Sequence, residues 1–378
     1  MPLRDLRGQR TIRKGEELVK HLSSFSLDLK FSAGVWYFAP GGGRFHDRYV
    51  EPMEMEQVLA TAASMKPYGL QAVECHYPNE INEENLDLFK TWANDTGMRV
   101  LTVVPNLFYP AQFEWGSLSN PDDATRQAAI DRVIETLKIN VELDTDFSIV
   151  WPGGDGFENT FGQNHAYART RFAEGLAEAM DTVPGVRICI ETKPYEPRGH
   201  ILYPTTAEGI ILCGKAEAAM KDEANCAAIA EGHAMMAMNP EIGHMAMAGE
   251  DLAYAFSLVM EYGRLGHTHW NSQPLGNYDQ DLNVGVVSPE QAEAALYALK
   301  IHAYGGYFGI DINPERMPIT RALLNNMDAV KGMNAWIDQM DHARIVEAVE
   351  RPADHRGVIE AMLIRARYGN TGAKLSDL

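Results

Sequence analysis

The chain has 378 residues, 46% of them hydrophobic, so it can bury the core of one large domain or of two small ones. Its 52 acidic side chains outnumber the 33 basic ones, and a net charge of −19 repels phosphate backbones, which argues against a nucleic-acid partner. Residues 1–20 lack the apolar core of a signal peptide, no apolar run is long enough to cross a bilayer, and the four cysteines form no CxxC pair, so we expect a cytoplasmic protein with reduced thiols and no membrane contact.

Short apolar runs alternate with longer helical patterns along the chain. Eight runs have the length and composition of strands: 29–37, 70–76, 99–105, 147–154, 187–194, 234–241, 265–271 and 306–314. The stretches between them include 53–67, 83–96, 121–143, 165–182, 248–263, 288–303 and 316–348. Several of these repeat apolar residues at the spacing of one helix face, as Ile130, Val133, Ile134 and Leu137 do.

This alternation predicts an α/β fold in which parallel strands are joined by right-handed crossovers. An eightfold count predicts a closed (β/α)8 TIM barrel over residues 29–349, with an N-terminal extension at 1–28 and a C-terminal tail at 350–378 that packs on a neighbouring subunit. The alternative is a doubly wound open sheet, which would carry a glycine-rich phosphate loop after the first strand. Gly41–Gly43 lie near that place but lack the GxGxxG order.

Polar and ionisable residues recur at the C-terminal ends of the expected strands: His76, Trp151, Glu191, Lys193, Glu241, His244, His269, Asn271, Asp311 and Asn313, with Asp279 and Asp281 in the loop after the seventh strand. In a barrel these ends converge on one face, which is where the active site lies. Carboxylates and imidazoles gathered there would repel and shift one another's pKa values. Divalent cations relieve this conflict, and oxygen ligands suit Mg²⁺ and Mn²⁺.

Each of these residues also has a structural interpretation. A single acidic residue after a strand is more often a helix cap or a surface group. His267 lies two residues before His269, so the two share one side of the strand, and His267 is a neighbour of the site rather than a ligand. Trp36, Phe108 and Trp151 are either barrel core or the apolar wall of a sugar pocket. The joint placement of the whole set, rather than any one residue, indicates a site.

Three segments closely resemble xylose isomerases, in the same order and with similar spacing: IETKPYEPRGHILYPT (190–205), MNPEIGHMAMAG (238–249) and GNYDQDLNVG (276–285). VWPGGDG (150–156) and NLFYPAQF (106–113) resemble two further segments of that family. The resemblance runs from about residue 31 to about 340. It implies an enzyme that interconverts an aldose and a ketose with two divalent metal ions, Mn²⁺, Co²⁺ or Mg²⁺.

The resemblance also implies a set of metal ligands. Glu191 and Asp311 match carboxylates of the metal that grips substrate hydroxyls, and Glu241 matches the carboxylate that bridges both metals. The second metal is implied to have three further ligands, His244, Asp279 and Asp281. His269 stands where xylose isomerases usually carry an aspartate, and it completes the expected set.

Catalytic and substrate-binding roles follow from the same resemblance. Lys193 matches the lysine that polarises the sugar carbonyl, His76 matches the histidine that assists ring opening, and Asp281 can accept the hydroxyl proton. The aromatic walls of the pocket are matched by Trp36, Phe108 and Trp151, and Phe45 resembles the aromatic that a neighbouring subunit inserts, which implies a homodimer or homotetramer.

Departures from the family pattern concern the substrate more than the reaction. The imidazole of His269 removes one negative charge and favours Mn²⁺ or Co²⁺ over Mg²⁺, and a histidine there is more similar to the rhamnose isomerase branch. Asn79 replaces the aspartate that usually supports His76, so either Glu80 substitutes or ring opening is weaker. Val104 replaces a polar threonine. These differences suggest a divergent aldose isomerase with a preference for a sugar other than D-xylose.

Two other functions remain open from the sequence. One is a metal-dependent sugar epimerase, dehydratase or lyase on the same barrel; an epimerase there would use one metal, with a pair of glutamates as acid and base. The other is a non-catalytic sugar-binding protein. The intact pairs Glu241–His244 and Asp279–Asp281 argue for a second metal and a hydride shift, because every expected ligand of that metal is present.

Overall fold

The structure is a computed structural model that describes residues 3–39 and 47–369. Within these ranges eight parallel strands form a barrel: β1 (Lys30–Gly34), β2 (Leu70–Tyr77), β3 (Arg99–Pro105), β4 (Ser148–Val150), β6 (Ile188–Ile190), β8 (Met236–Met238), β9 (His269–Trp270) and β10 (Tyr307–Ile310). Bridges between Thr102 and Phe147 and between Met238 and Leu265 join the two ladders. Because β1 pairs with both β2 and β10, the sheet closes, and the TIM barrel is confirmed over the open sheet.

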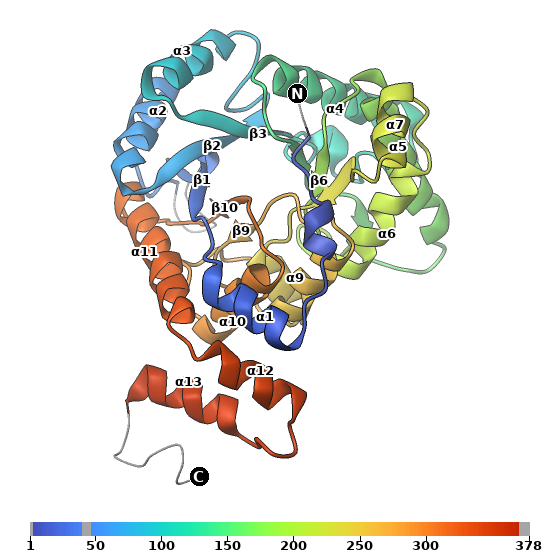
Figure 1. Cartoon of the computed structure of the whole chain (residues 1–378). Helices are drawn as coiled ribbons and strands as arrows, with labels where there is room; N and C mark the ends of the chain where they lie inside the picture. Colours follow the sequence, from blue (N-terminus) through green and yellow to red (C-terminus); the bar gives the residue numbers. More distant parts are fainter. Residues whose placement is uncertain (1–2, 40–46, 370–378) are drawn as a thin grey trace.

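Helices surround the barrel (Figure 1) and follow the strands in the expected alternation. They are α2 (Met55–Ser64), α3 (Leu86–Thr96), α4 (Asp123–Glu142), α5 (His165–Thr182), α6 (Thr206–Glu217), α7 (Glu223–Ala230), α8 (Ile242–Met247), α9 (Leu252–Glu261), α10 (Pro289–Ile301) and α11 (Ile319–Asp338). Side-chain caps set several of their starts: Asp122 accepts a hydrogen bond from the amide of Thr125, and Asp251 accepts one from that of Tyr254. No helix in the described ranges is long and apolar enough to span a membrane.

Two hydrophobic clusters lie on the two sides of the strands. Outward-facing side chains such as Val73 and Cys75 pack under the helices in the larger cluster. Inward-facing ones, including Ala72, Leu101 and Phe147, form a smaller cluster inside the barrel. Side chains alternate along a strand, so the inward face of β2 carries Ala72, then Glu74, then His76 toward the C-terminal end. That strand therefore brings two ionisable groups from the core to the barrel mouth.

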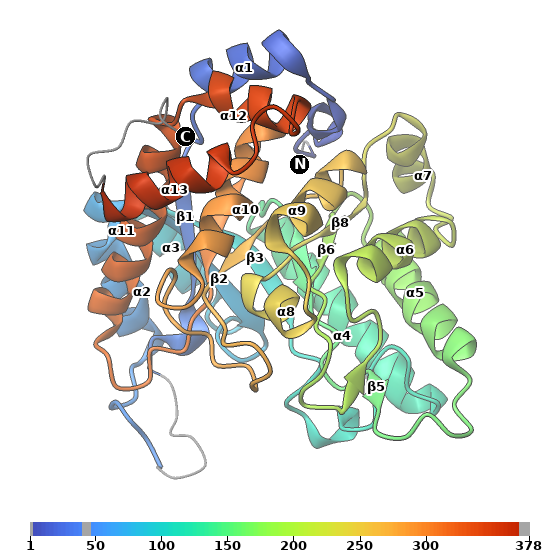
Figure 2. The ribbon, with the colours of Figure 1, turned by 90° about the horizontal axis from the view of Figure 1, so that it is seen from below.

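The terminal segments contain helices of their own. α1 (Gly15–Ser24) packs against α12 (His342–Glu350), and α13 (Val358–Tyr368) follows α12 on the outside of the barrel (Figures 1 and 2). The helical stretch 316–348 contains α11 and most of α12: the chain leaves the helical path after α11, and the carboxylate of Asp341 caps the next helix. The boundaries expected for the N-terminal extension and the C-terminal tail stay predictions.

Two further short strands and four short helical turns lie in the part of the chain that the structure describes. β5 (Gly156–Phe157) pairs antiparallel with β7 (His200–Ile201) outside the barrel. The 3-10 turns are Arg7–Arg10, Val35–Tyr37, Lys66–Tyr68 and Ala111–Phe113. Of the four cysteines, Cys75, Cys189 and Cys213 are buried, Cys226 is exposed, and all are free.

Candidate metal centre

A cavity of about 460 Å³ opens among the loops that follow the barrel strands. Its lining includes each described residue to which the sequence assigns a metal-binding, catalytic or substrate-binding role: Trp36, His76, Phe108, Trp151, Glu191, Lys193, Glu241, His244, His269, Asp279, Asp281 and Asp311. Phe45 lies outside the described residues, so its expected place in the pocket stays a prediction. The cavity is partly open and mixes apolar rings with buried charges, as small polar-ligand sites do.

The first cluster of candidate ligands consists of Glu191, Glu241, His269 and Asp311, which offer one ligand atom each within 4.8 Å of one another. The Nδ1 atom of His269 lies 2.9 Å from Oε2 of Glu191 and 3.1 Å from Oδ2 of Asp311. Glu191, Glu241 and Asp311 follow β6, β8 and β10, and His269 begins β9, so the four residues come from four consecutive strands of the barrel. Strand closure thus brings together side chains that are up to 120 residues apart (191 to 311).

A second cluster adjoins the first and shares Glu241 with it. Glu241, His244 and Asp279 also offer ligand atoms within 4.8 Å of one another. His244 Nδ1 lies 3.3 Å from Glu241 Oε2, since the two residues are three apart at the start of α8, and its Nε2 lies 3.2 Å from Asp279 Oδ2. Asn271 donates from Nδ2 to Oε1 of Glu241 at 2.8 Å and to Oδ1 of Asp281 at 2.9 Å, which places Asp281 beside the pair.

The two clusters hold more carboxylates than the positively charged side chains around them can neutralise. Burial raises the pKa of Glu241 well above its usual value, and the carboxylates of Asp279 and Asp281 raise it further. The pKa of Asp281 is raised well above its usual value by burial and then by Asp279 and Asp311. Burial also acts to raise the pKa of Glu191, but the nearby His269 outweighs it and holds that pKa below its usual value. A divalent cation would keep all these carboxylates ionised.

The residues present fit a pair of divalent cations. Nδ1 of His269, Nδ1 of His244 and Oδ1 of Asp279 are buried and have no hydrogen-bond partner among the described residues. Buried polar atoms are normally hydrogen-bonded, so three orphaned ones at the same place indicate a missing ligand. Carboxylate oxygens mixed with imidazole nitrogens are a donor set that suits Mn²⁺, Co²⁺ and Mg²⁺.

Within residues 3–39 and 47–369, Lys193 is the one lysine that lines this cavity. Its Nζ donates to Oδ2 of Asp279 at 2.7 Å and lies 5.2 Å from the centre of the Trp151 ring. Burial acts to lower the pKa of Lys193, but Asp279 outweighs it and the pKa is raised. The ammonium group therefore stays charged inside the pocket and can donate to an oxygen bound there.

Aromatic rings form a continuous wall of the cavity. Ring centres are 4.5 Å apart between Trp36 and His76, 5.4 Å between His76 and Phe108, and 4.7 Å between Phe108 and Trp151. The Trp36 indole N–H donates to Oδ1 of Asp311 at 3.2 Å, so this wall is tied to the first cluster. An apolar wall of this kind packs against the C–H faces of a ligand and keeps bulk water out.

Glu80, rather than Asn79, supports His76. Oε2 of Glu80 accepts from the backbone amide of His76 at 2.6 Å and lies 3.1 Å from its Nδ1. Asn79 turns toward another side chain and accepts a hydrogen bond from Asn106 at 2.6 Å. Of the two possibilities left open by the sequence, the geometry favours substitution of the missing aspartate by Glu80. Val104 lines the cavity as expected.

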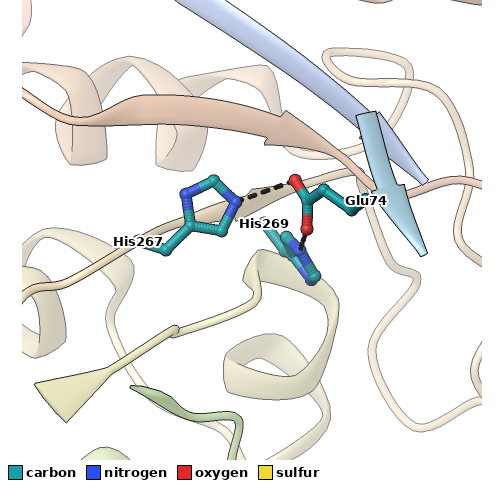
Figure 3. A group of neighbouring side chains, drawn as sticks. All are labelled: Glu74, His267 and His269. Atoms are coloured by element: carbon teal, nitrogen blue, oxygen red, sulfur yellow. Dashed lines mark hydrogen bonds and ion pairs between the residues drawn. The ribbon is translucent and has the colours of Figure 1, made fainter. Parts of the chain in front are cut away.

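The sequence reasoning missed Glu74 and Asn239. Glu74 is fully buried on β2, and its two oxygens each lie 3.0 Å from an Nε2 atom, one in His267 and one in His269 (Figure 3). Asn239 donates from Nδ2 to Oε2 of Glu191 at 2.6 Å. The alternation along β2 would have shown Glu74 on the same face as His76, two residues deeper in the barrel.

Gly309 of β10 leaves room for this buried group. A methyl group added at Gly309 would lie 2.6 Å from His267 Nε2 and 2.9 Å from Glu74 Oε1, closer than packed atoms allow. We expect Gly309→Ala to destabilise the fold by about 1–3 kcal/mol through overpacking, seen as a lower thermal midpoint by circular dichroism. Gly305→Ala is the matched control, because a methyl there meets no atom within 4 Å. Equal thermal midpoints for the two variants would contradict the prediction, because they would show that the side chains around Gly309 can move to accommodate a methyl group.

Residues 62–340 match the family model described as the xylose isomerase-like TIM barrel. Curated xylose isomerases from Thermus thermophilus and Thermus caldophilus are 27% and 29% identical over 290 and 293 residues, which is 74% of this chain and 70% of each relative. Similar solved structures include D-psicose 3-epimerase with D-fructose (16% identity, TM-score 0.58) and 3-keto-D-glucoside 4-epimerase from E. coli (14%, TM-score 0.56), each covering 82% of this chain and 100% of the other. At such identity these two structures show the fold alone.

Proposed function

Since the chain belongs to the xylose isomerase-like TIM barrel family, we propose that it is a metal-dependent aldose–ketose isomerase that moves a hydride between C1 and C2 of a monosaccharide. The observation that carries this proposal is the pair of clusters that share Glu241, with Lys193 in the same cavity. An epimerase with one metal has no use for the second set of ligands.

Two cations have separate sets of residues to hold them. Glu191, Glu241, His269 and Asp311 would hold one, and Glu241 would hold the other together with His244, Asp279 and Asp281. Bound there, divalent cations supply Lewis acidity to two neighbouring sugar oxygens. The single imidazole in each set favours Mn²⁺ or Co²⁺ over Mg²⁺.

The side chains in the cavity account for the remaining chemistry. In the aldose-to-ketose direction the C2–H bond breaks, and its electron pair and hydrogen pass to C1. The proton leaves O2 and a proton arrives at O1, so that C2 becomes the carbonyl and C1 the alcohol. Asp281 accepts the proton from O2, because its carboxylate lies in the cavity beside the second cluster, where Nδ2 of Asn271 donates to its Oδ1 at 2.9 Å. Lys193 donates to O1 as negative charge develops there.

The aromatic wall and His76 prepare the sugar for that transfer. Trp36, Phe108 and Trp151 exclude bulk water, which favours direct hydride movement over exchange with solvent. Glu80 holds His76 by its Nδ1 atom, so the other ring nitrogen is left to assist opening of the cyclic sugar.

The floor of the cavity bears on the choice of sugar. Val104 and Ile149 lie inside the barrel on β3 and β4 and offer the ligand no hydrogen bond from their side chains. A buried sugar hydroxyl placed there would lose its hydrogen bonds with water and gain none. This supports a substrate other than D-xylose, one that presents an apolar end with few hydroxyl groups to this floor.

Isotope transfer tests the reaction class. The protein is loaded with Mn²⁺, Co²⁺ or Mg²⁺ and screened against pentoses and hexoses, and the best substrate is then supplied with deuterium at C2. Recovery of the deuterium at C1 of the ketose is the expected result. Complete exchange of the deuterium with solvent would refute the hydride shift and indicate an enediol route. An inverted centre elsewhere in the sugar would identify an epimerase, and tight cation binding with no turnover on any sugar would identify a binding protein.

A further inference from the structure

We infer that Glu74 is a positioning residue that holds the His269 ring so that its Nδ1 atom faces the first cluster. Glu74 does not line the cavity and touches no group proposed to meet the sugar. This inference rests on the proposed function, because it concerns the cation that the first cluster would hold.

Both oxygens of Glu74 are engaged with imidazole rings. Oε1 lies 3.0 Å from Nε2 of His267, and Oε2 lies 3.0 Å from Nε2 of His269, so the carboxylate sits between the two rings (Figure 3). All three side chains are at most 3% exposed, so water does not compete for these hydrogen bonds. A carboxylate buried this deeply is costly unless both of its oxygens are satisfied.

The hydrogen-bonding chemistry of these groups fixes where the imidazole protons lie. An ionised carboxylate only accepts, so each Nε2 atom that faces it carries a hydrogen. A neutral His269 with hydrogen on Nε2 has its lone pair on Nδ1. That atom lies 2.9 Å from Glu191 and 3.1 Å from Asp311, and no donor within the described ranges hydrogen-bonds to it. Glu74 therefore selects the tautomer that can bind a cation.

His267 holds Glu74 in turn. Its ring is fully buried, lies 5.0 Å from the centre of the Phe147 ring and 5.2 Å from that of His269, and leaves only Nε2 to bond to Glu74. With one oxygen engaged by His267, the carboxylate cannot turn away from His269. The close approach of Gly309 to both side chains shows that β10 is shaped around this group.

Glu74→Gln tests the inference, because the amide keeps the shape but can accept from only one of the two rings. The apo protein is titrated with Mn²⁺, and free ion is followed by electron paramagnetic resonance. We expect the variant to bind Mn²⁺ about 10–100-fold more weakly than the wild type. Glu217→Gln is the matched control: its carboxylate is also largely buried and paired, with Arg264 on the far side of the barrel wall, and Mn²⁺ affinity should not change.

A second measurement reports the tautomer itself. In protein with ¹⁵N-labelled histidine and bound Mg²⁺, His269 should show hydrogen on Nε2 and none on Nδ1, and Glu74→Gln should lose that pattern. His269→Gln identifies the signal. His267→Gln keeps a donor at the position of Nε2, so it should retain most of the Mn²⁺ affinity, whereas His267→Leu should not.

The outcomes separate the inference from the proposed function. If the wild type binds no Mn²⁺, the metal centre itself is refuted. If the wild type binds Mn²⁺ and Glu74→Gln binds it equally well with an unchanged His269 signal, only the role of Glu74 is refuted. If Glu74→Gln does not fold, Glu74→Asp takes its place: the shorter side chain must lengthen both contacts, and wild-type affinity in that variant would overturn the inference.

Discussion

Glu241→Gln should abolish isomerisation, lowering kcat/KM by about a thousandfold or more. It should also weaken Mn²⁺ binding at both clusters. The reason is that Glu241 belongs to both sets of ligands, so one neutral amide removes a charged oxygen from each. Loss of Lewis acidity at two sugar oxygens removes several kcal/mol of transition-state stabilisation, and about 4 kcal/mol corresponds to that thousandfold change. Steady-state kinetics and calorimetric Mn²⁺ titration measure the two effects.

Glu217→Gln serves as the control for this variant too, since it alters a largely buried, paired glutamate on α6 without touching the cavity. It should keep wild-type activity. Full activity in Glu241→Gln would rule out the role assigned to that residue, and loss of only one of two Mn²⁺ equivalents would show that the clusters do not share it.

Lys193→Met should lower kcat by about 10²–10³-fold while Mn²⁺ binding is kept. Methionine preserves much of the length but removes the donor proposed to act on the carbonyl oxygen, and a single such donor is worth about that factor. Nζ of Lys193 also neutralises Asp279, so its loss leaves that carboxylate freer to bind a cation. Steady-state kinetics with varied sugar concentration give kcat and KM, and Mn²⁺ titration gives the affinity for the ion.

Lys138→Met is the matched control for this second variant, because Lys138 is an exposed lysine of α4 with only a surface ion pair to Glu135. It should behave as the wild type. A rise in KM for Lys193→Met with kcat unchanged would make Lys193 a binding group rather than one that acts in the transition state.

The fold followed from the sequence more completely than the strand ends did. The runs 70–76 and 99–105 nearly match β2 and β3. The runs 147–154 and 265–271 are much longer than β4 and β9, which have three and two residues. The run 147–154 continues past β4 to Trp151, which lines the cavity, whereas most of the run 265–271 precedes β9. Composition cannot tell a paired strand from a buried loop.

The site was predictable where its residues end strands, since barrel closure brings every such position to one face. Glu74 was missed because it lies in mid-strand among apolar neighbours, and its role becomes visible only when its partners His267 and His269 are known. The choice between Asn79 and Glu80 depended on the turn after β2, which carries both side chains in different directions. The position of Phe45 falls outside the described residues.

The closure of the barrel by its first and last strands has a consequence for folding. β1 pairs with β10, so the edge formed by residues 30–34 has no partner until residues 307–310 have been synthesised. Asp311 follows directly, and without it the first cluster lacks a carboxylate. A nascent or truncated chain that stops before β10 should thus have neither a closed sheet nor high affinity for Mn²⁺. The moment at which a refolding chain binds Mn²⁺ would therefore report when β10 pairs with β1. This pairing is a late event, because it joins distant parts of the chain.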